Sequence, residues 1–419
     1  MKTYILVARH LGKVSGEKIY HYNKMRYMLS LGWRVIFLSG KEETTPFDSN
    51  EHYSNLVFPA LTYAPECYPR REVKKTVDDV AAAIGEPGDE RCIIESDAVN
   101  RAVWGELIAK RLGAKHMVFL LQERHPYDED IRAFLRFKYD RHELAGITVH
   151  SMNQIFADEH MEPRADAKIA ACCQNSVEEC EDLISDQIPK GAALTFGSIG
   201  RLDKGCVPAI LKGFRAYAAA HPEEKYNLVL IGGATGRKRL RQILQEMKAC
   251  DTIHTIITGY LYPIPASLLR NIDVFVSTAG SATVSYRFHR PTVIVHPSTG
   301  EPCGVLGLGE SGAKTMYDPL PDTSLEACIE SALAHADEIN YVYNGYEDYT
   351  QRMNIEFARQ LSIAETAAQK EYYDEARLMK IRTTHIKGHT VHWLVGHTIG
   401  AAGLNRFVSA YKIVRREGR

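Results

Sequence analysis

The stretch from residue 194 to residue 295 constrains the fold most, because buried-type strands and helices alternate along it. The segments expected as strands are Leu194–Ile199, Asn227–Ile231, Thr252–Ile257, Asp273–Val276 and Thr292–Val295, and those expected as helices are Cys206–Ala219 and Arg237–Ala249. Strands that alternate with helices form a parallel sheet. Ligands of such sheets bind beyond the carboxyl ends of the strands.

Two of these strand ends carry glycine together with cationic or hydroxyl residues. The first loop reads Gly-Arg-Leu-Asp-Lys-Gly over 200–205, and the second reads Ser-Thr-Ala-Gly-Ser-Ala-Thr over 277–283. Backbone N–H groups at a helix N-terminus and nearby cations hold phosphate. The alternatives are solvated loop charges at Arg201 and Lys204, and a plain turn whose helix is capped by Ser281 or Thr283.

The first half of the chain has the same pattern. Its expected strands are Thr3–Ala8, Arg34–Leu38, Arg91–Ile94, Lys115–Leu121, Gly146–Val149 and Ala167–Ala171, and its expected helices include Glu17–Leu31 and Arg101–Leu112. Asp97 is expected to cap the second of these helices. A length of 419 residues favours two domains. We therefore expect two Rossmann-like parallel-sheet domains that face each other across a cleft, with a polar, acidic linker between Asn175 and Gly191.

In the order and spacing of its motifs the chain resembles the GT-B glycosyltransferases, closest to the retaining family 4 type. The resemblance covers about residues 1–375. It rests on Leu31-Gly32-Trp33-Arg34-Val35, Gln174-Asn175-Ser176-Val177-Glu178, Gly200-Arg201-Leu202 with Lys204-Gly205, Leu230-Ile231-Gly232-Gly233, Thr258-Gly259-Tyr260 and Ile272-Asp273-Val274-Phe275-Val276.

The resemblance implies a domain order and a set of donor-site residues. Residues 1–180 would form the acceptor-side domain, 191–353 the nucleotide-sugar-binding domain, 354–376 a returning helix and 377–419 an extra tail. Arg201 and Lys204 would stabilise the charge of the leaving diphosphate. The donor-binding set would be Gly200, Tyr260, Gly280, Ser281, Ala282 and Thr283.

Further candidates come from loops of the first domain, where the family presents residues to both substrates. They are His10, Gly12, Gly16, Glu123 and His125. A plain turn is the alternative for the first loop, and a surface position is the alternative for His125.

Two departures from the family pattern bear on the chemistry. Arg201 and Lys204 are three residues apart where the family has about five, and the two carboxylates expected before Pro291 are absent. The carboxylates that normally hold the hydroxyls of the donor sugar are therefore missing from this chain. No Asp-x-Asp follows a strand, so we expect no metal and no cofactor other than a UDP- or GDP-linked sugar as substrate.

The tail is basic and amphipathic. Residues 380–419 hold eight Lys or Arg and one acid, which gives +7 and leaves −8 for the rest of the chain, whose net charge is −1. Leu404, Phe407, Val408 and Tyr411 recur at helical spacing. Residues 404–419 are expected either to lie on an anionic membrane surface or to pack on the protein itself.

Nine cysteines without a C-x-x-C pair and no secretory signal predict a cytoplasmic protein, peripheral to the membrane if the tail binds lipid. The leading hypothesis is transfer of a sugar from a nucleotide donor to a hydroxyl of a glycan or lipid-linked acceptor, in glycan or surface-polysaccharide assembly. The alternatives are a nucleotide-sugar epimerase of the same fold and a non-catalytic scaffold. No nucleic-acid partner is expected.

Overall fold

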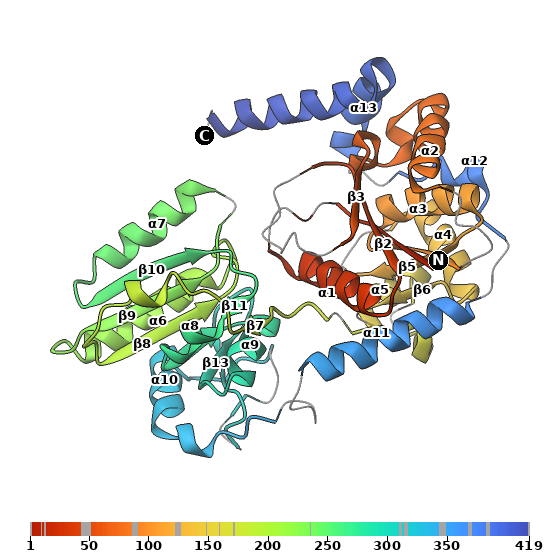
Figure 1. Ribbon diagram of the computed structural model, residues 1–419. Coiled ribbons are helices and arrows are strands. Elements are labelled where there is room, and N and C mark those ends of the chain that lie inside the picture. Colours follow the sequence, from red (N-terminus) through yellow and green to blue (C-terminus); the bar gives the residue numbers. More distant parts are fainter. Residues whose placement is uncertain are drawn as a thin grey trace. The chain divides into compact units, whose positions relative to one another are not determined.

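The chain divides into two compact units. The computed structural model describes residues 2–417 except 10, 12–13, 43–51, 86–90, 122–126, 148, 159, 171, 235, 310–311, 314–316, 343–348, 368–370 and 383–385. Unit 1 comprises Met1–Gly12, Tyr20–Cys172 and Met353–Arg419, and unit 2 comprises Lys13–Ile19 and Cys173–Arg352. Each unit is built on its own parallel sheet, so the predicted α/β class with two Rossmann-like domains is confirmed (Figure 1).

The sheet of unit 1 has six parallel strands in the order β3-β2-β1-β4-β5-β6. The strands are β1 (Thr3–Val7), β2 (Arg34–Ser39), β3 (Ser54–Val57), β4 (Cys92–Ser96), β5 (Lys115–Leu120) and β6 (Leu144–Gly146). This is the strand order of the doubly wound nucleotide-binding fold. Val7 pairs with both Leu38 and Ser96, so the carboxyl ends of the central strands meet at one edge.

Helices cover both faces of this sheet. The helices of unit 1 are α1 (Gly16–Ser30), α2 (Arg70–Ile84), α3 (Val99–Leu112), α4 (Glu129–Asp140), α5 (Val149–Phe156), α11 (Tyr349–Thr366), α12 (Glu375–Leu378) and α13 (Ile386–Glu417), with short 3-10 turns η1 (Pro59–Thr62), η2 (Pro65–Cys67) and η3 (Ala165–Ala167). Side chains alternate along each strand. Ile5, Ile94 and Val118 therefore share one buried cluster with α2, α3 and α4.

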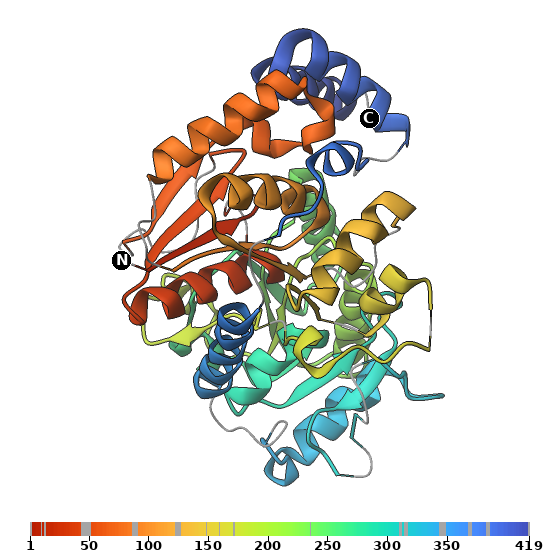
Figure 2. The same ribbon diagram turned by 90° about the vertical axis from the view of Figure 1, so that its right-hand side faces the viewer.

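The opposite face is covered by α1 and α11, which Figure 2 shows side by side in red and blue. Lys24 of α1 is fully buried, with its Nζ 4.9 Å from the ring centre of Phe357 and 2.8 Å from Oε1 of Gln360. The hydroxyl of Tyr20 donates to Glu95 at 2.9 Å. A buried lysine is tolerated here because aromatic rings, an amide oxygen and a carboxylate surround its charge.

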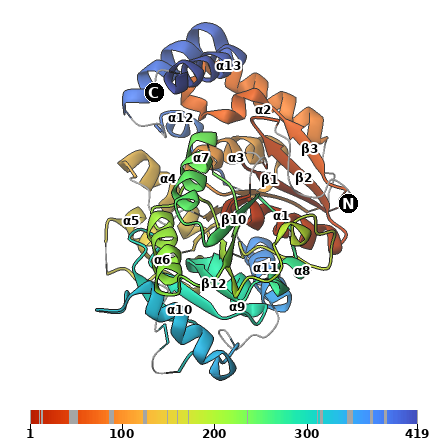
Figure 3. The same ribbon diagram turned by 90° about the vertical axis from the view of Figure 1, so that its left-hand side faces the viewer.

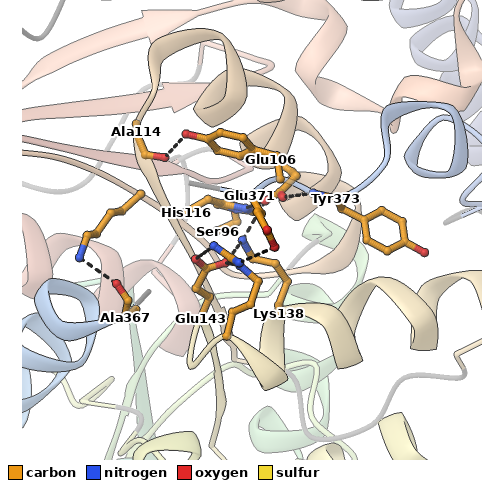
Figure 4. A network of polar contacts seen from close by, with 12 residues as sticks. Ser96, Glu106, Ala114, His116, Lys138, Glu143, Ala367, Glu371 and Tyr373 are labelled. Carbon is orange, nitrogen blue, oxygen red and sulfur yellow. Dashed lines mark hydrogen bonds and ion pairs between the residues drawn. The ribbon is translucent and has the colours of Figure 1, made fainter. Parts of the chain in front are cut away.

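A second buried network ties the chain beyond α11 to α3 and β5 (Figure 4). Glu106 accepts hydrogen bonds from Nδ1 of His116 at 2.7 Å, from Nζ of Lys138 at 2.8 Å and from the backbone N of Tyr373 at 2.8 Å. Lys138 also donates to Glu143 at 2.6 Å. Burial and the Lys138 charge lower the pKa of His116 to about 4. The imidazole is therefore neutral, and its proton on Nδ1 satisfies the carboxylate.

The sheet of unit 2 has the order β10-β9-β8-β12-β13-β14, with only β14 antiparallel. Its strands are β8 (Leu194–Ile199), β9 (Tyr226–Ile231), β10 (Ile253–Gly259), β12 (Val274–Ser277), β13 (Thr292–Val295) and β14 (Pro302–Val305). A separate pair joins β7 (Val177–Glu178) to β11 (Ile264–Pro265). The segment predicted as a linker is therefore packed on unit 2: Oδ2 of Asp182 accepts from Oγ of Ser267 at 2.6 Å.

The helices of unit 2 are α6 (Val207–Ala220), α7 (Arg237–Lys248), α8 (Ala266–Arg270), α9 (Ala282–Arg287) and α10 (Leu325–Ala334), with 3-10 turns η4 (Ser185–Gln187), η5 (Ala279–Ser281) and η6 (Ala336–Glu338). Leu228 and Leu230 pack with α6, α7 and α10 on one face, a layer visible in Figure 3. Val229 and Ile231 pack with α8 on the other. This alternation explains the continuous apolar run of β9, because a parallel strand is buried on both faces.

Three local expectations for unit 1 were wrong. Gly146 ends β6 and Val149 begins α5, so 146–149 is not a strand, because a short apolar run does not distinguish strand from helix. The segment expected as a strand over 167–171 forms, within its described residues 167–170, an isolated bridge between Lys168 and Gly146 rather than a strand. The returning helix, expected over 354–376, begins at Tyr349 and ends at Thr366, and the backbone N of Tyr373 bonds Glu106 instead.

Asp97 does not cap α3. The residue at the cap is Ala98, which makes no side-chain cap hydrogen bond. The Asp97 carboxylate instead forms an ion pair with Arg101 and lies 3.2 Å from Nε2 of His21. Burial alone would raise its pKa, but Arg101 and His21 hold the pKa of Asp97 below its usual range. Asp97 thus links α1 to α3.

The tail forms α13, which bends at Gly400. Of the predicted stripe, Leu404 is fully buried and Val408 packs against the core of unit 1, whereas Phe407 and Tyr411 are exposed. In the described part of the chain no helix combines the length and the apolar character needed to cross a bilayer. All nine cysteines are free thiols.

Candidate functional site

The loop after β8 packs directly on the loop after β9. A Cβ added to Gly232 would lie 1.9 Å from the carbonyl oxygen of Gly200, a contact that only glycine avoids. The N–H of Gly200 donates to Ile231 O at 3.0 Å, and that of Leu202 donates to Gly233 O at 2.9 Å. These bonds fix the two glycine loops against each other at the carboxyl edge of the sheet.

Lys204 is the partly buried cation of this edge. A Cβ added to Gly200 would lie 3.7 Å from its Nζ, so the ammonium group lies against the glycine loop. Among the described residues no carboxylate lies within ion-pair distance of it. Burial and the neighbouring Arg201 lower the pKa of Lys204 from its usual value of 10.5. A bound anion would stabilise the charged form of Lys204, because burial disfavours that form and no described carboxylate pairs with it.

Arg201 is more exposed, at 53 %, and its Nε lies 3.9 Å from Oδ1 of Asp203. That distance and exposure make the ion pair weak. The guanidinium therefore stays available for a phosphate, although it is less constrained than Lys204.

The loop over 280–283 differs in detail from a helix N-terminus with free donors. The N–H of Ser281 bonds Thr278 O at 3.1 Å, and that of Ala282 bonds Ala279 O. Neither Ser281 nor Thr283 caps α9, since Oγ1 of Thr283 donates to Gly280 O at 2.9 Å. Because α9 has only six residues, its dipole is short. We therefore assign the charge of this edge chiefly to Lys204 and Arg201.

Tyr260 forms an aromatic wall beside these loops. A Cβ on Gly233 would lie 2.6 Å from its ring, so glycine lets the ring lie against the backbone. Burial and Asp203 raise the pKa of Tyr260 above 10.0, and its hydroxyl remains protonated. An aromatic face next to a cationic loop can stack on a planar base or on a sugar ring.

A pocket of about 210 Å³ joins these features within unit 2. Its lining comprises Val14, Ser15, Gly16, Ile19, Cys173, Gln174, Asn175, Ile199, Gly200, Arg201, Lys204, Ile231, Gly232, Tyr260, Leu261, Gly280, Ser281 and Val284. The described lining contains two cations and no carboxylate or imidazole. It is built to receive an anion, and it offers no carboxylate oxygens for a divalent cation.

The structure thus brings seven of the predicted site residues to one pocket: Gly16, Gly200, Arg201, Lys204, Tyr260, Gly280 and Ser281. Ala282 is buried in the core and the Thr283 hydroxyl donates to Gly280 O; neither residue lines the pocket. His10, Gly12, Glu123 and His125 lie outside the described residues.

Sequence reasoning missed the contribution of Cys173, Gln174 and Asn175 to the pocket. Nδ2 of Asn175 donates to Leu261 O at 2.8 Å, which fixes the segment beside the loop that carries Tyr260. The signal in the sequence is the Gln174-Asn175-Ser176-Val177-Glu178 motif, which by itself indicates only a domain boundary.

Solved structures with the same architecture identify the fold. HepE of Anabaena, with UDP and glucose, matches at 11 % identity over 87 % of this chain and 99 % of its own, with a TM-score of 0.55. Sucrose-phosphate synthase of Thermosynechococcus elongatus matches at 16 % identity over 87 % and 97 %, with a TM-score of 0.52. A glycosyltransferase of Rickettsia africae matches at 9 % over 93 % and 97 %, with a TM-score of 0.51.

No protein-family model and no curated protein sequence matches the chain. Identities this low establish the fold alone. The chain has the GT-B fold, as its motif order predicted.

Proposed function

We propose that this protein is a glycosyltransferase that uses a UDP- or GDP-linked sugar and a hydroxyl acceptor. The observation that carries the proposal is Lys204, a partly buried cation without a carboxylate partner among the described residues, against a glycine loop at the carboxyl edge of a parallel sheet. Ligands of open α/β sheets bind at this edge. The UDP and glucose bound to HepE, which shares the fold, agree with a nucleotide sugar as the donor.

The proposed reaction places charge where the pocket has cations. The acceptor oxygen forms a new bond to the anomeric carbon, the bond to the diphosphate breaks, and its electron pair stays on the departing phosphate oxygen. The acceptor's proton passes to solvent as the new bond forms, since the described lining has no carboxylate or imidazole to accept it. Lys204 and Arg201 stabilise the departing diphosphate. We propose that they act in place of a metal ion, because the described lining has no carboxylate ligand.

An epimerase is the less favoured reading. Proton abstraction from a sugar carbon requires a positioned base. The described lining offers no carboxylate and no imidazole for that role. We further propose that the acceptor is a glycan or a lipid-linked saccharide in surface-polysaccharide assembly, and that the protein works at the cytoplasmic side of a membrane. The basic composition of residues 380–419 supports the membrane part of this proposal.

Nucleotide binding and sugar transfer test the proposal in turn. We expect UDP or GDP, and not the matching monophosphates, to raise the melting temperature, because binding to the native state adds stability in proportion to RT ln(1 + [L]/Kd). The nucleotide that binds is then supplied as its sugar conjugates with hydroxyl acceptors, and release of free diphosphate is measured. Binding without acceptor-dependent release would favour the scaffold, and interconversion of the donor sugar would favour the epimerase.

A further inference from the structure

Helix α13 carries a concentration of exposed apolar side chains. Six of the thirteen large hydrophobic residues exposed in the described part of the chain belong to it. Four of the six lie within nine residues and form what we name the 391–399 patch: Val391, Trp393, Leu394 and Ile399, with Leu394 58 % and Ile399 55 % exposed. Large apolar patches at a surface mark sites of contact with a partner or a membrane.

The same helix is anchored on unit 1 by residues that lie between those of the patch. A Cβ added to Gly396 would lie 2.1 Å from Cys67 O, so this residue must be glycine for the helix to approach η2. Val395 and Leu404 pack against the core of unit 1. Unit 1 thus covers the side of α13 that carries Gly396 and Leu404, and the four side chains of the 391–399 patch remain exposed around it.

The bend at Gly400 is also held by unit 1. Oε1 of Glu72 accepts from the backbone N of Ala401 at 2.7 Å and so caps the second half of α13. Nδ2 of Asn405 donates to Pro59 O at 2.9 Å. These contacts place Ile399 at a fixed corner. The patch is therefore a defined surface rather than the side of a fraying terminus.

The segment that carries the patch is basic. Lys380, Arg382 and Arg406 are exposed in its described part. The sequence from 380 to 419 carries +7 in all. Exposed apolar side chains on a basic segment complement anionic phospholipid, whose acyl boundary accepts the apolar side chains while its phosphates attract the cations.

We infer that the 391–399 patch docks α13 on an anionic membrane, with Trp393 and Leu394 entering the boundary between headgroups and acyl chains. The contact surface is then not the 404–411 stripe, because Leu404 and Val408 are used inside the protein. This inference refines the membrane-side location within the proposed function. It depends neither on nucleotide binding nor on transfer.

Tryptophan fluorescence provides a direct test on the full-length protein. Trp33 and Trp104 are buried, so Trp393 is the exposed member of the three tryptophans. With vesicles of phosphatidylcholine and phosphatidylglycerol that contain brominated acyl chains, we expect quenching of Trp393. With phosphatidylcholine alone we expect little. Quenching should diminish as salt is added, because the cations contribute through screened charge.

Sedimentation with the same vesicles gives the matched comparison. The double variant Leu394→Ser with Ile399→Ser should bind at least tenfold more weakly, whereas Leu183→Ser, which alters a side chain 69 % exposed in unit 2, should bind like the parent. Each change lies at the surface, and unchanged melting temperatures would establish that folding is intact. Equal binding by the double variant, or no quenching with anionic vesicles, would overturn the inference.

A second copy of the chain is the other outcome the data can reveal. Concentration-dependent dimers in the ultracentrifuge that protect Trp393 from acrylamide without lipid, and that vesicles do not dissociate, would show that the patch is a protein interface and would also overturn the inference. Failure of nucleotides to raise the melting temperature, with vesicle binding intact, would count against the proposed transferase and leave the patch standing.

Discussion

At the scale of single residues, substitutions of Lys204 and Gly232 test whether the pocket binds nucleotide. For Lys204→Ala we expect nucleoside diphosphate affinity to fall by about 1–3 kcal/mol, the range for a lost charge-assisted hydrogen bond. Arg201→Ala should lower the affinity for nucleoside diphosphate by less, because the Arg201 side chain is half exposed and its ion pair with Asp203 is weak. Isothermal titration measures both, with exposed Lys212→Ala of α6 as the control. Unchanged affinity in a folded Lys204→Ala protein would remove this residue from the site.

Gly232 has a near neighbour that serves as its control. Gly232→Ala would force a Cβ to within 1.9 Å of Gly200 O, whereas Gly236→Ala meets nothing within 4 Å. We expect the first variant to lose about 1–3 kcal/mol of unfolding free energy and most of its nucleotide binding, because the two loops must separate. The second should behave like the parent in titration and in urea unfolding. Equal behaviour of the two variants would mean that the packing of the loops does not shape the pocket.

At the scale of elements, the network that joins α3, α4 and β5 makes stability depend on pH. The pKa of His116 is about 4 in the folded chain and 6.5 in its ordinary state, so the unfolded chain binds the extra proton between these values. Stability should therefore decrease as the pH falls from about 6.5 to about 4, by up to about 3 kcal/mol from this group. The pKa of Glu106 is lowered in the folded chain, so protonation of this carboxylate should reduce stability further as the pH falls below about 4.5. Burial raises the pKa of Glu143, so this group should instead reduce stability as the pH rises above about 4.5.

Urea unfolding followed by tryptophan fluorescence at a series of pH values measures this dependence. His116→Gln should flatten the slope between about pH 6.5 and 4, while exposed His254→Gln in unit 2 should leave it unchanged. A slope that is the same in His116→Gln would show that other groups cause the acid sensitivity.

At the scale of the whole molecule, two units with separate cores should respond separately to nucleotide. Trp33, Trp104 and Trp393 all lie in unit 1, so tryptophan fluorescence follows unit 1, whereas calorimetry registers both units. Because the pocket belongs to unit 2, we expect UDP or GDP to raise a calorimetric transition that fluorescence does not follow. If fluorescence and heat absorption shift together, the two units unfold as one cooperative body.

The sequence by itself determined the two parallel sheets and the placement of Gly200, Arg201 and Lys204 at a strand end. Apolar runs, helical periodicity and glycine-rich strand ends are local patterns. They can be recognised in the sequence because backbone geometry and burial impose them over a few neighbouring residues. Such patterns failed where they were brief, as at 146–149, where the apolar run cannot distinguish strand from helix.

Only the tertiary structure decided which side chains share an environment. Asp97 pairs with His21, Asn175 anchors beside Tyr260, and Leu404 turns inward while Leu394 faces out. Each outcome depends on contact between segments far apart in the chain. Leucines on one helix are equivalent in the sequence until another part of the fold covers one of them. Burial by distant segments therefore decided which side chains belong to the core and which form a contact surface. It also left Lys204 partly buried without a carboxylate partner among the described residues. The proposed chemistry depends on this property of Lys204.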